Sequence, residues 1–293
     1  MVTINYKGAI MEIAEKGAEV RRFKSAEGRE CLWSGDKDVW GGVSPILFPI
    51  AGPLINNTIT INGKPYSIPK HGFARNMEFK LIEQGDNFAT LELTENEESL
   101  SYYPFAFSLQ LTHRILDNGF ETVVVITNKN DSTMPFTIGG HAGFTCPMKD
   151  GEKFTDYALY FEKPEKGECI KCGPNDPTTD IEVVPLGENN DCLTLEYEKF
   201  DARDTYLFRD IQSECVCLLN KETKKGIQVS FSKVPVLAIW TASFKKAPYL
   251  CIEPWEGTKA LTDETGRFED KPYMVHLPAG EKHTFFYRMQ EIN

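Results

Sequence analysis

The sequence predicts an all-β protein, and three observations support this fold class. Segments with alternating apolar and polar side chains recur along most of the 293 residues, as expected for strands that cover a core with one face. Asn62-Gly63 and Asp117-Asn118-Gly119 separate neighbouring segments and match hairpin turns. Helical periodicity is confined to short stretches. Strands that follow one another at turn-sized intervals indicate a sandwich or barrel.

The strand candidates begin with 58–62 and its return segment 64–70, on either side of the Asn62-Gly63 turn. In chain order the others are 88–94, 108–116, 121–128, 156–161, 193–198, 215–220, 226–232, 236–244, 249–255 and 283–289. Short helices are expected near 97–103 and 260–266. Residues 163–192 are rich in Gly, Pro and Asp, so we expect a surface excursion there. Because no linker or composition break divides the chain, we expect a single domain over residues 1–293.

Composition excludes several classes of function. The chain carries 32 Lys and Arg against 43 Asp and Glu, a net charge of −11. This balance disfavours nucleic acid and anionic membranes as partners, because both require clustered basic residues. No apolar run approaches the roughly 18 residues that span a bilayer. The first twenty residues lack the basic and apolar regions of a signal peptide, so a cytoplasmic location is expected.

The cysteines and the absent motifs predict neither a metal nor a cofactor. The chain has eight cysteines, and without a signal peptide we expect reduced thiols. Cys169 and Cys172 form one C-x-x-C pair, but no second pair or nearby histidine pair completes a zinc site. The chain also lacks the phosphate-binding, dinucleotide-binding, zinc-protease and nucleophile-elbow motifs.

Two histidines stand beside glycines at the ends of strand candidates. His71 lies in Lys70-His71-Gly72-Phe73-Ala74-Arg75, where His71 and Arg75 could converge on one oxygen-rich ligand. His141 lies in Ile138-Gly139-Gly140-His141-Ala142-Gly143, and glycines around a polar residue often mark the close approach of a ligand. The simpler interpretations are a solvated hairpin end and an irregular loop.

Acidic residues provide two further candidates. Glu253 follows Cys251 on an apolar strand face beside Trp255, a setting that raises a carboxyl pKa and suits a general base. Trp255 also offers a flat surface for a sugar ring. Asp204 and its neighbour Asp201 precede another apolar run and are candidates for ligand binding or simple turn formers.

The remaining histidines are predicted to have structural or surface positions. His113 shares a strand face with leucines and is expected to be a core residue with its hydrogen bonds satisfied. His276 and His283 flank the turn before the last strand and are expected at the surface.

Five segments in order resemble the galactose mutarotase-like superfamily. They are PILFPIAG (45–52), HGFAR (71–75), GGHAGF (139–144), IWT (239–241) and CIEPWEG (251–257). The most similar branch is the LacX-like group of aldose 1-epimerase-related proteins. The resemblance covers nearly the whole chain and implies a large antiparallel β-supersandwich.

The resemblance also implies roles for individual residues. His71 matches the family histidine that binds the sugar and helps to polarise its ring oxygen, and His141 matches the proposed general acid. Glu253 matches the general base, and Asp204 is similar in position to the substrate-binding aspartate. Better-known members carry an Asn-Arg pair where residues 52–57 have no arginine.

The function expected from the resemblance is interconversion of the α and β anomers of an aldohexose such as galactose or glucose. Arg75 is expected to replace the missing arginine in substrate binding, with Trp255 as a sugar contact. Two alternatives remain: a hexose-6-phosphate 1-epimerase, and a non-catalytic carbohydrate-binding protein of the same fold. The first would need additional cationic side chains for the phosphate.

Overall fold

Antiparallel strands dominate the computed structural model, which describes residues 1–172 and 179–293. About 46% of the chain is strand and 9% is helix. Every pair of neighbouring strands is antiparallel, from the β1–β2 pair to the β8–β9 pair. The predicted all-β class and antiparallel supersandwich are therefore confirmed. No helix in the described ranges is both long and apolar enough to cross a membrane.

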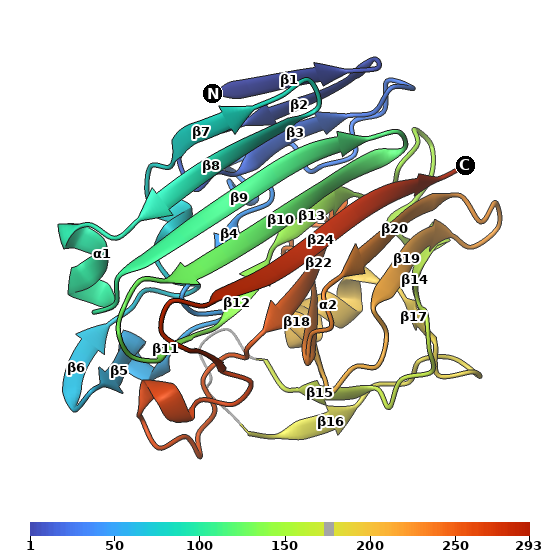
Figure 1. Ribbon diagram of the computed structural model, residues 1–293. Helices are drawn as coiled ribbons and strands as arrows, with labels where there is room; N and C mark the ends of the chain where they lie inside the picture. Colours follow the sequence, from blue (N-terminus) through green and yellow to red (C-terminus); the bar gives the residue numbers. More distant parts are fainter. Residues whose placement is uncertain (173–178) are drawn as a thin grey trace.

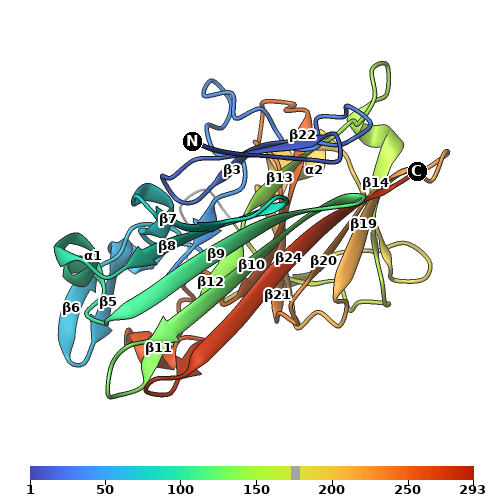
Figure 2. The same ribbon diagram turned by 45° about the horizontal axis from the view of Figure 1, so that its top comes forward.

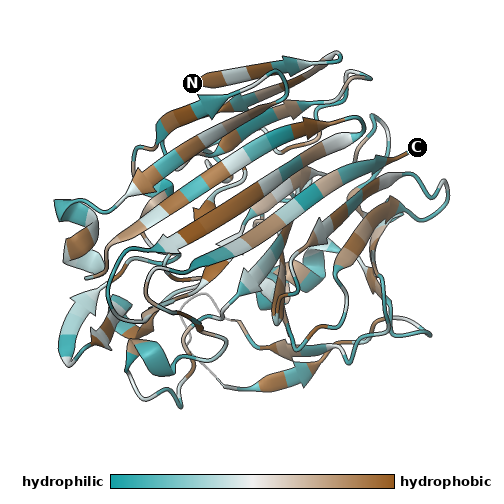
Figure 3. Ribbon diagram, in the orientation of Figure 1, coloured by the Kyte–Doolittle hydropathy of each residue, from teal (hydrophilic) through white to brown (hydrophobic). Residues whose placement is uncertain are grey.

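The largest sheet in the described residues has nine strands and crosses the front of the molecule in Figure 1. From one edge to the other they are β17 (Cys192–Thr194), β14 (Tyr157–Phe161), β19 (Cys215–Asn220), β20 (Gly226–Phe231), β24 (Lys282–Ile292), β10 (Gly119–Asn128), β9 (Phe107–Leu116), β8 (Phe88–Thr94) and β7 (Lys80–Gln84). Bands of apolar and polar residues alternate along them (Figure 3), because one face of the sheet packs on the core.

The second sheet lies behind the first, as the two views in Figures 1 and 2 show. Its strands are β16 (Ile181–Val183), β15 (Glu168–Ile170), β18 (Thr205–Arg209), β21 (Val236–Trp240), β22 (Tyr249–Glu256), β12 (Ile138–Gly140) and β4 (Ile46–Leu47), and β13 (Ala142–Thr145) also pairs with β22. All eight residues of β22 are buried, so both faces of this strand are covered.

Smaller elements complete the structure. The further strands are β1 (Val2–Tyr6), β2 (Ala9–Ile13), β3 (Val20–Lys24), β5 (Thr58–Ile61), β6 (Lys64–Ser67), β11 (Met134–Phe136) and β23 (Val275–Leu277). The helices are α1 (Glu97–Tyr102) and α2 (Tyr197–Arg203), with short 3-10 turns η1 (Ile55–Asn57), η2 (Ala74–Asn76), η3 (Phe154–Asp156) and η4 (Phe268–Asp270). Asn96 caps α1 by accepting a hydrogen bond from Ser99 N at 2.8 Å.

The alternation of side chains along β22 determines where the functional residues lie. Leu250 and Ile252 point into the main core shared with the nine-stranded sheet. Cys251 and Trp255 belong to two separate apolar clusters on the opposite face. Glu253 lies between them in the sequence and therefore shares their face, because successive strand residues point to opposite sides of a sheet.

Most predicted elements are confirmed, and several need correction. The surface excursion expected over residues 163–192 lies partly outside the described residues, and its described part contains the paired strands β15 and β16. The segments 88–94 and 215–220 coincide with β8 and β19. The predicted strand 193–198 stops at residue 194, and α2 follows because its buried Phe200 packs on Phe154 and Tyr206. The strand predicted over 236–244 ends at residue 240. The helix expected near 260–266 is absent, and turns occupy that stretch.

Candidate active site

One cavity of about 670 Å³ collects all six residues proposed from the sequence. They are His71, Arg75, His141, Asp204, Glu253 and Trp255. Asp201, the competitor of Asp204, does not line the cavity and instead accepts a hydrogen bond from Phe244 N. Segments distant in sequence thus meet at one place, on the face of the second sheet that points away from the nine-stranded sheet.

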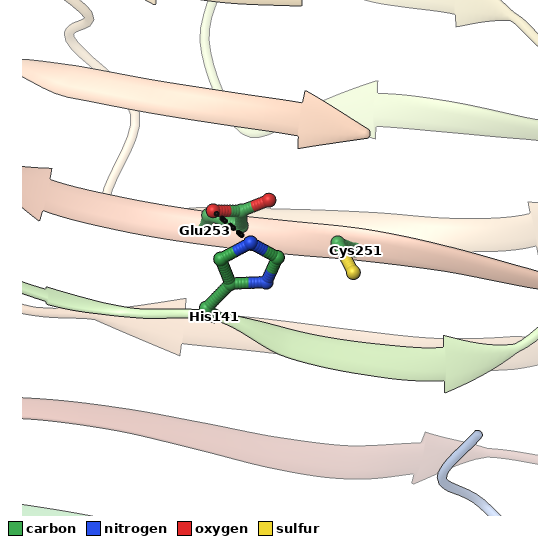
Figure 4. Close-up of side chains that lie close together, drawn as sticks. All are labelled: His141, Cys251 and Glu253. Carbon is green, nitrogen blue, oxygen red and sulfur yellow. Dashed lines mark ion pairs between the residues drawn. The ribbon is translucent and has the colours of Figure 1, made fainter. Parts of the chain in front are cut away.

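Strand register brings His141 to Glu253. His141 separates β12 from β13, and both of these strands pair with β22, with Gly139 opposite Trp255 and Ala142 opposite Ile252. A Cβ atom on Gly139 would lie 2.6 Å from Trp255 Cδ1, so only glycine fits there. The glycine-rich run thus permits the close packing that places the imidazole against the carboxyl group (Figure 4).

His141 and Glu253 form a buried pair. His141 Nε2 lies 3.3 Å from Glu253 Oε2, and the two side chains are 10% and 2% exposed. Burial raises the pKa of the Glu253 carboxyl well above its usual value and lowers the pKa of the His141 imidazole. Both effects favour the uncharged pair, and burial outweighs the charges of the neighbouring Lys70, Arg75 and Asp204.

His71 is held in one tautomer. Gly52 N donates a hydrogen bond to His71 Nδ1 at 3.0 Å, so the neutral ring carries its proton on Nε2. Burial lowers the pKa of this imidazole well below its usual value, with the neighbouring His141 adding to the effect. His71 has a φ of 67°, a left-handed conformation that is uncommon outside glycine and tends to occur at functional sites.

Arg75 and Asp204 lie on the cavity wall. Arg75 comes from η2, and its Nη2 donates to Lys70 O at 3.0 Å, while its buried Nε has no partner in the described part of the chain. Asp204 ends α2 with a φ of 65° and accepts a hydrogen bond from Thr205 Oγ1 at 3.0 Å. Like His71, Asp204 is thus a non-glycine residue in a strained conformation.

The tryptophans differ from the sequence-based expectation. Trp255, proposed as a flat surface for sugar, is only 5% exposed, and its ring meets His71 edge-on at 5.7 Å. Its Nε1 is buried, and its interaction with Glu253 lowers the pKa of that carboxyl against the larger effect of burial. Trp40 and Trp240 line the same cavity and are half-buried, so their rings are more accessible than that of Trp255.

Cys251 completes a group of three potential metal ligands with His141 and Glu253, whose ligand atoms lie within 4.8 Å of one another. Figure 4 shows that the imidazole meets Glu253 through one nitrogen, with Cys251 to its side. Burial raises the pKa of the Cys251 thiol well above its usual value. Since the thiolate is the metal ligand, this burial disfavours Cys251 as a ligand.

Other sequence candidates lie apart from the cavity. His113 is buried and hydrogen-bonds Ala18 O at 2.8 Å and Thr122 Oγ1 at 2.9 Å, as expected of a core histidine. His276 is exposed, as expected. The surface position predicted for His283 is only partly correct, because its side chain is 26% exposed and pairs with Glu256 at 2.6 Å.

Sequence reasoning missed several residues of the cavity wall. Lys70 and Lys259 join Arg75 as cationic residues of the wall, and Asn56, Trp40 and Cys172 also line it. For Trp40, the adjacent Gly41-Gly42 pair was an available signal, since glycines beside a large polar or aromatic residue mark close packing. Lys259 had no such signal, because its contact with the cavity depends on where β22 ends.

All eight cysteines fall within the described residues and are free thiols.

Comparison with known proteins identifies the family. Residues 1–290 match the pattern of the aldose 1-epimerase family. The chain belongs to this family. Protein LacX, chromosomal, of Lactococcus lactis subsp. lactis is 33% identical over 285 residues, which cover 94% of this chain and 95% of that protein.

Two solved structures are similar over the full length. A galactose mutarotase related enzyme from Lactobacillus acidophilus has a TM-score of 0.92 at 29% identity and covers 100% of this chain and 97% of its own. A galactose mutarotase-like protein from Lactobacillus casei ATCC 334 has a TM-score of 0.91 at 28% identity, with 100% of both chains covered.

These matches confirm the family resemblance and the reaction class predicted from the sequence. The protein is an isomerase of the aldose 1-epimerase type, and its substrate is a sugar.

Proposed function

We propose that the cavity interconverts the α and β anomers of an aldohexose, with Glu253 as general base and His141 as general acid. The observation that carries this proposal is the 3.3 Å approach of His141 Nε2 to Glu253 Oε2 on the wall of an open cavity. One titratable pair within reach of one bound sugar is what anomer exchange needs, because two protons must move on neighbouring oxygens.

The reaction balances without any external proton donor. Glu253 removes the proton from the hydroxyl on C1 while His141 donates a proton to the ring oxygen, and the bond between C1 and this oxygen breaks. The open-chain aldehyde turns about its C1–C2 bond and presents its other face. The same two groups then reverse the transfers and close the ring as the other anomer.

The proton content of the buried pair fits this cycle. Ring opening starts from carboxylate and imidazolium and leaves carboxylic acid and imidazole on the protein. Both forms of the pair hold the same number of protons, so the uncharged form favoured by burial converts to the charged form by one transfer over 3.3 Å. Hydroxyls of the sugar stabilise the charges when they enter the cavity.

The other residues hold the sugar. His71 donates from Nε2, because Gly52 occupies Nδ1, and this donor suits the ring oxygen. Asp204 accepts hydroxyl hydrogens, and the Arg75 guanidinium on the cavity wall takes the place of the arginine missing from residues 52–57. Trp255 lines the floor of the cavity as an apolar contact for the ring. The free thiols support a reducing, cytoplasmic setting for the reaction.

Polarimetry with fresh α-glucose and α-galactose tests the proposal after subtraction of spontaneous mutarotation. Glu253→Gln keeps shape and hydrogen bonding but cannot take the proton, so kcat is expected to fall about 10²–10⁴-fold, and His141→Asn should act alike. Glu256→Gln is the matched control, because Glu256 lies on the same strand but pairs with His283. Equal rates in Glu253→Gln and the unmodified protein would remove Glu253 as the base.

A second candidate substrate is a hexose 6-phosphate, favoured by the three cationic side chains on the wall, Lys70, Arg75 and Lys259. Cations close together in a cavity attract a phosphate dianion. The same assay with a hexose 6-phosphate tests this alternative, with Lys70→Gln as the variant. A KM for the phosphate ester well below that for the free sugar, raised by Lys70→Gln, would favour the phosphorylated substrate.

A further inference from the structure

Hydrogen bonds do not explain the orientation of His141. A functional imidazole is ordinarily oriented by a bond to its second nitrogen, and Gly52 supplies such a bond to His71. In the ranges that the structure describes, no other residue forms a hydrogen bond with Nδ1 of His141, although this atom is buried. Without another restraint, the ring could turn about its bond to Cβ and carry Nε2 away from Glu253.

Aromatic packing supplies the restraint. The Trp40 ring lies 5.0 Å from the His141 ring, centroid to centroid, at an interplanar angle of only 30°. Trp240 and His71 meet the imidazole edge-on, at 5.8 Å and 5.4 Å. We propose that Trp40 is a positioning residue whose indole covers one face of the His141 imidazole and holds Nε2 toward Glu253. This inference rests on the function proposed above.

Trp40 is itself fixed in place. Cβ atoms on Gly42 and Gly143 would lie 2.6 Å and 3.0 Å from the indole, so both glycines leave space that the ring fills. Trp33 Nε1 donates to the Trp40 carbonyl oxygen at 2.8 Å. Lys245 Nζ donates to the carbonyl oxygen of Asp38 in the same loop at 3.2 Å. A ring held from several sides can restrain its neighbour.

The position of Trp40 on the cavity wall allows a different role, as a surface on which the sugar stacks. The two roles separate kinetically. Loss of a stacking surface weakens binding and raises KM, whereas a misaligned acid lowers kcat. A displacement of about 1 Å at a reacting group can cost roughly 10²-fold in rate.

The first experiment compares kcat and KM of four variants by polarimetry. Trp40→Ala is expected to lower kcat roughly 10²-fold with little change in KM, and Trp40→Phe should restore most of the rate because it keeps a flat ring. Gly42→Ala displaces the indole without removing it and should lower kcat as well. Gly41→Ala is the matched control, since its Cβ would make ordinary contacts with Lys37, 3.5 Å from Cγ and 4.0 Å from Cα, and it should leave kcat unchanged.

The second experiment observes the His141 ring without reference to activity. NMR of histidine-labelled protein, with His141 assigned by its loss in His141→Asn, follows the imidazole as a function of pH. Water that enters in Trp40→Ala is expected to raise the His141 pKa toward the ordinary value of about 6.5. The charged and titratable neighbours Glu253, Cys251, His71, Lys70 and Arg75 all remain in this variant, so a change in the His141 pKa reports on the loss of the indole.

The outcomes distinguish the two proposals. A raised KM with unchanged kcat and an unchanged His141 titration in Trp40→Ala overturns the positioning role. A changed titration in Trp40→Ala, together with full activity in His141→Asn, supports Trp40 as the restraint on the ring while rejecting His141 as the acid. A changed titration with a lowered kcat supports both.

Discussion

At the scale of residues, the proton exchange proposed for His141 and Glu253 predicts how activity responds to pH. Burial lowers one pKa and raises the other, so the pair keeps its single proton over a wide range, and its two apparent pKa values belong to the pair. We expect kcat to stay flat through about pH 6.5, the ordinary histidine pKa, and to fall only at more acidic and more alkaline pH. A limb of the kcat profile centred near pH 6.5 would contradict this prediction.

His113 predicts how stability responds to acid. Burial lowers the pKa of this core imidazole to about 4, below its unfolded value, so protonation favours the unfolded chain. The contribution of neutral His113 to the free energy of unfolding is fully present above about pH 6.5. It is lost as the pH falls toward 4, and the loss amounts to about 3 kcal/mol. Urea unfolding at pH 7 and pH 4 gives the free energy of unfolding at each pH. The difference between these two values should be smaller for His113→Gln than for the unmodified protein. The exposed His276 provides the control, since His276→Gln should leave the difference unchanged.

Residue types beside glycine or on an apolar strand face were sufficient to select His71, His141 and Glu253 as candidates, and the family resemblance supplied the roles expected of them. The cavity positions of Trp40 and Lys259 were not predictable in this way, because both reach the cavity from loops whose path depends on the completed sheets. The proton exchange proposed for the pair also required coordinates, since the proposal rests on burial and on the 3.3 Å distance.

At the scale of elements, the turn that carries His71 depends on Gly72. This glycine has a φ of 73°, and a Cβ atom there would lie 2.0 Å from the carbonyl oxygen of Phe48. Gly63 has a φ of 76° with nothing within 4 Å of the added Cβ, so it is a matched control for backbone strain. We expect Gly63→Ala to cost about 1 kcal/mol of unfolding free energy and Gly72→Ala about 1–3 kcal/mol more.

Gly72→Ala and Gly63→Ala should also differ in activity. Gly72→Ala displaces His71 and should lower kcat/KM, whereas Gly63→Ala should retain the activity of the unmodified protein. Thermal unfolding and polarimetry provide the two measurements. Equal losses in both variants would show that the contact with Phe48 does not position the turn.

The strands were predictable from side-chain alternation, and their ends were less so. The alternation of apolar and polar side chains identified β8 and β19, because each of these strands packs one face on the core. The same pattern failed at residues 193–198, where LTLEYE alternates but the chain enters α2. Tertiary burial of Phe200 outweighs the local pattern there, and a single sequence carries no sign of it.

At the scale of the whole molecule, one apolar cluster draws residues from Val2 to Met289. We therefore expect the proposed single domain to unfold in one cooperative step. Tryptophan fluorescence, which reports on the cavity wall, and far-ultraviolet circular dichroism, which reports on the sheets, should give the same thermal midpoint. Two separated midpoints would contradict the single domain.

The order of strands was not predictable from the sequence, although the fold class was. Hairpin turns indicate which neighbours in the chain pair, as β9 and β10 do. Long-range pairs such as β10 with β24 leave no local signal, and only the resemblance to a known family supplied the supersandwich.

The central position of β24 has a consequence for synthesis. β24 begins at residue 282, after every other strand in the described residues, yet it lies between β10 and β20. While the chain emerges from the ribosome, those two strands therefore present open edges that can recruit strands of other nascent chains. Premature termination before residue 282 should consequently give aggregates, and chaperones that shield strand edges should raise the yield of the full chain in cell-free translation.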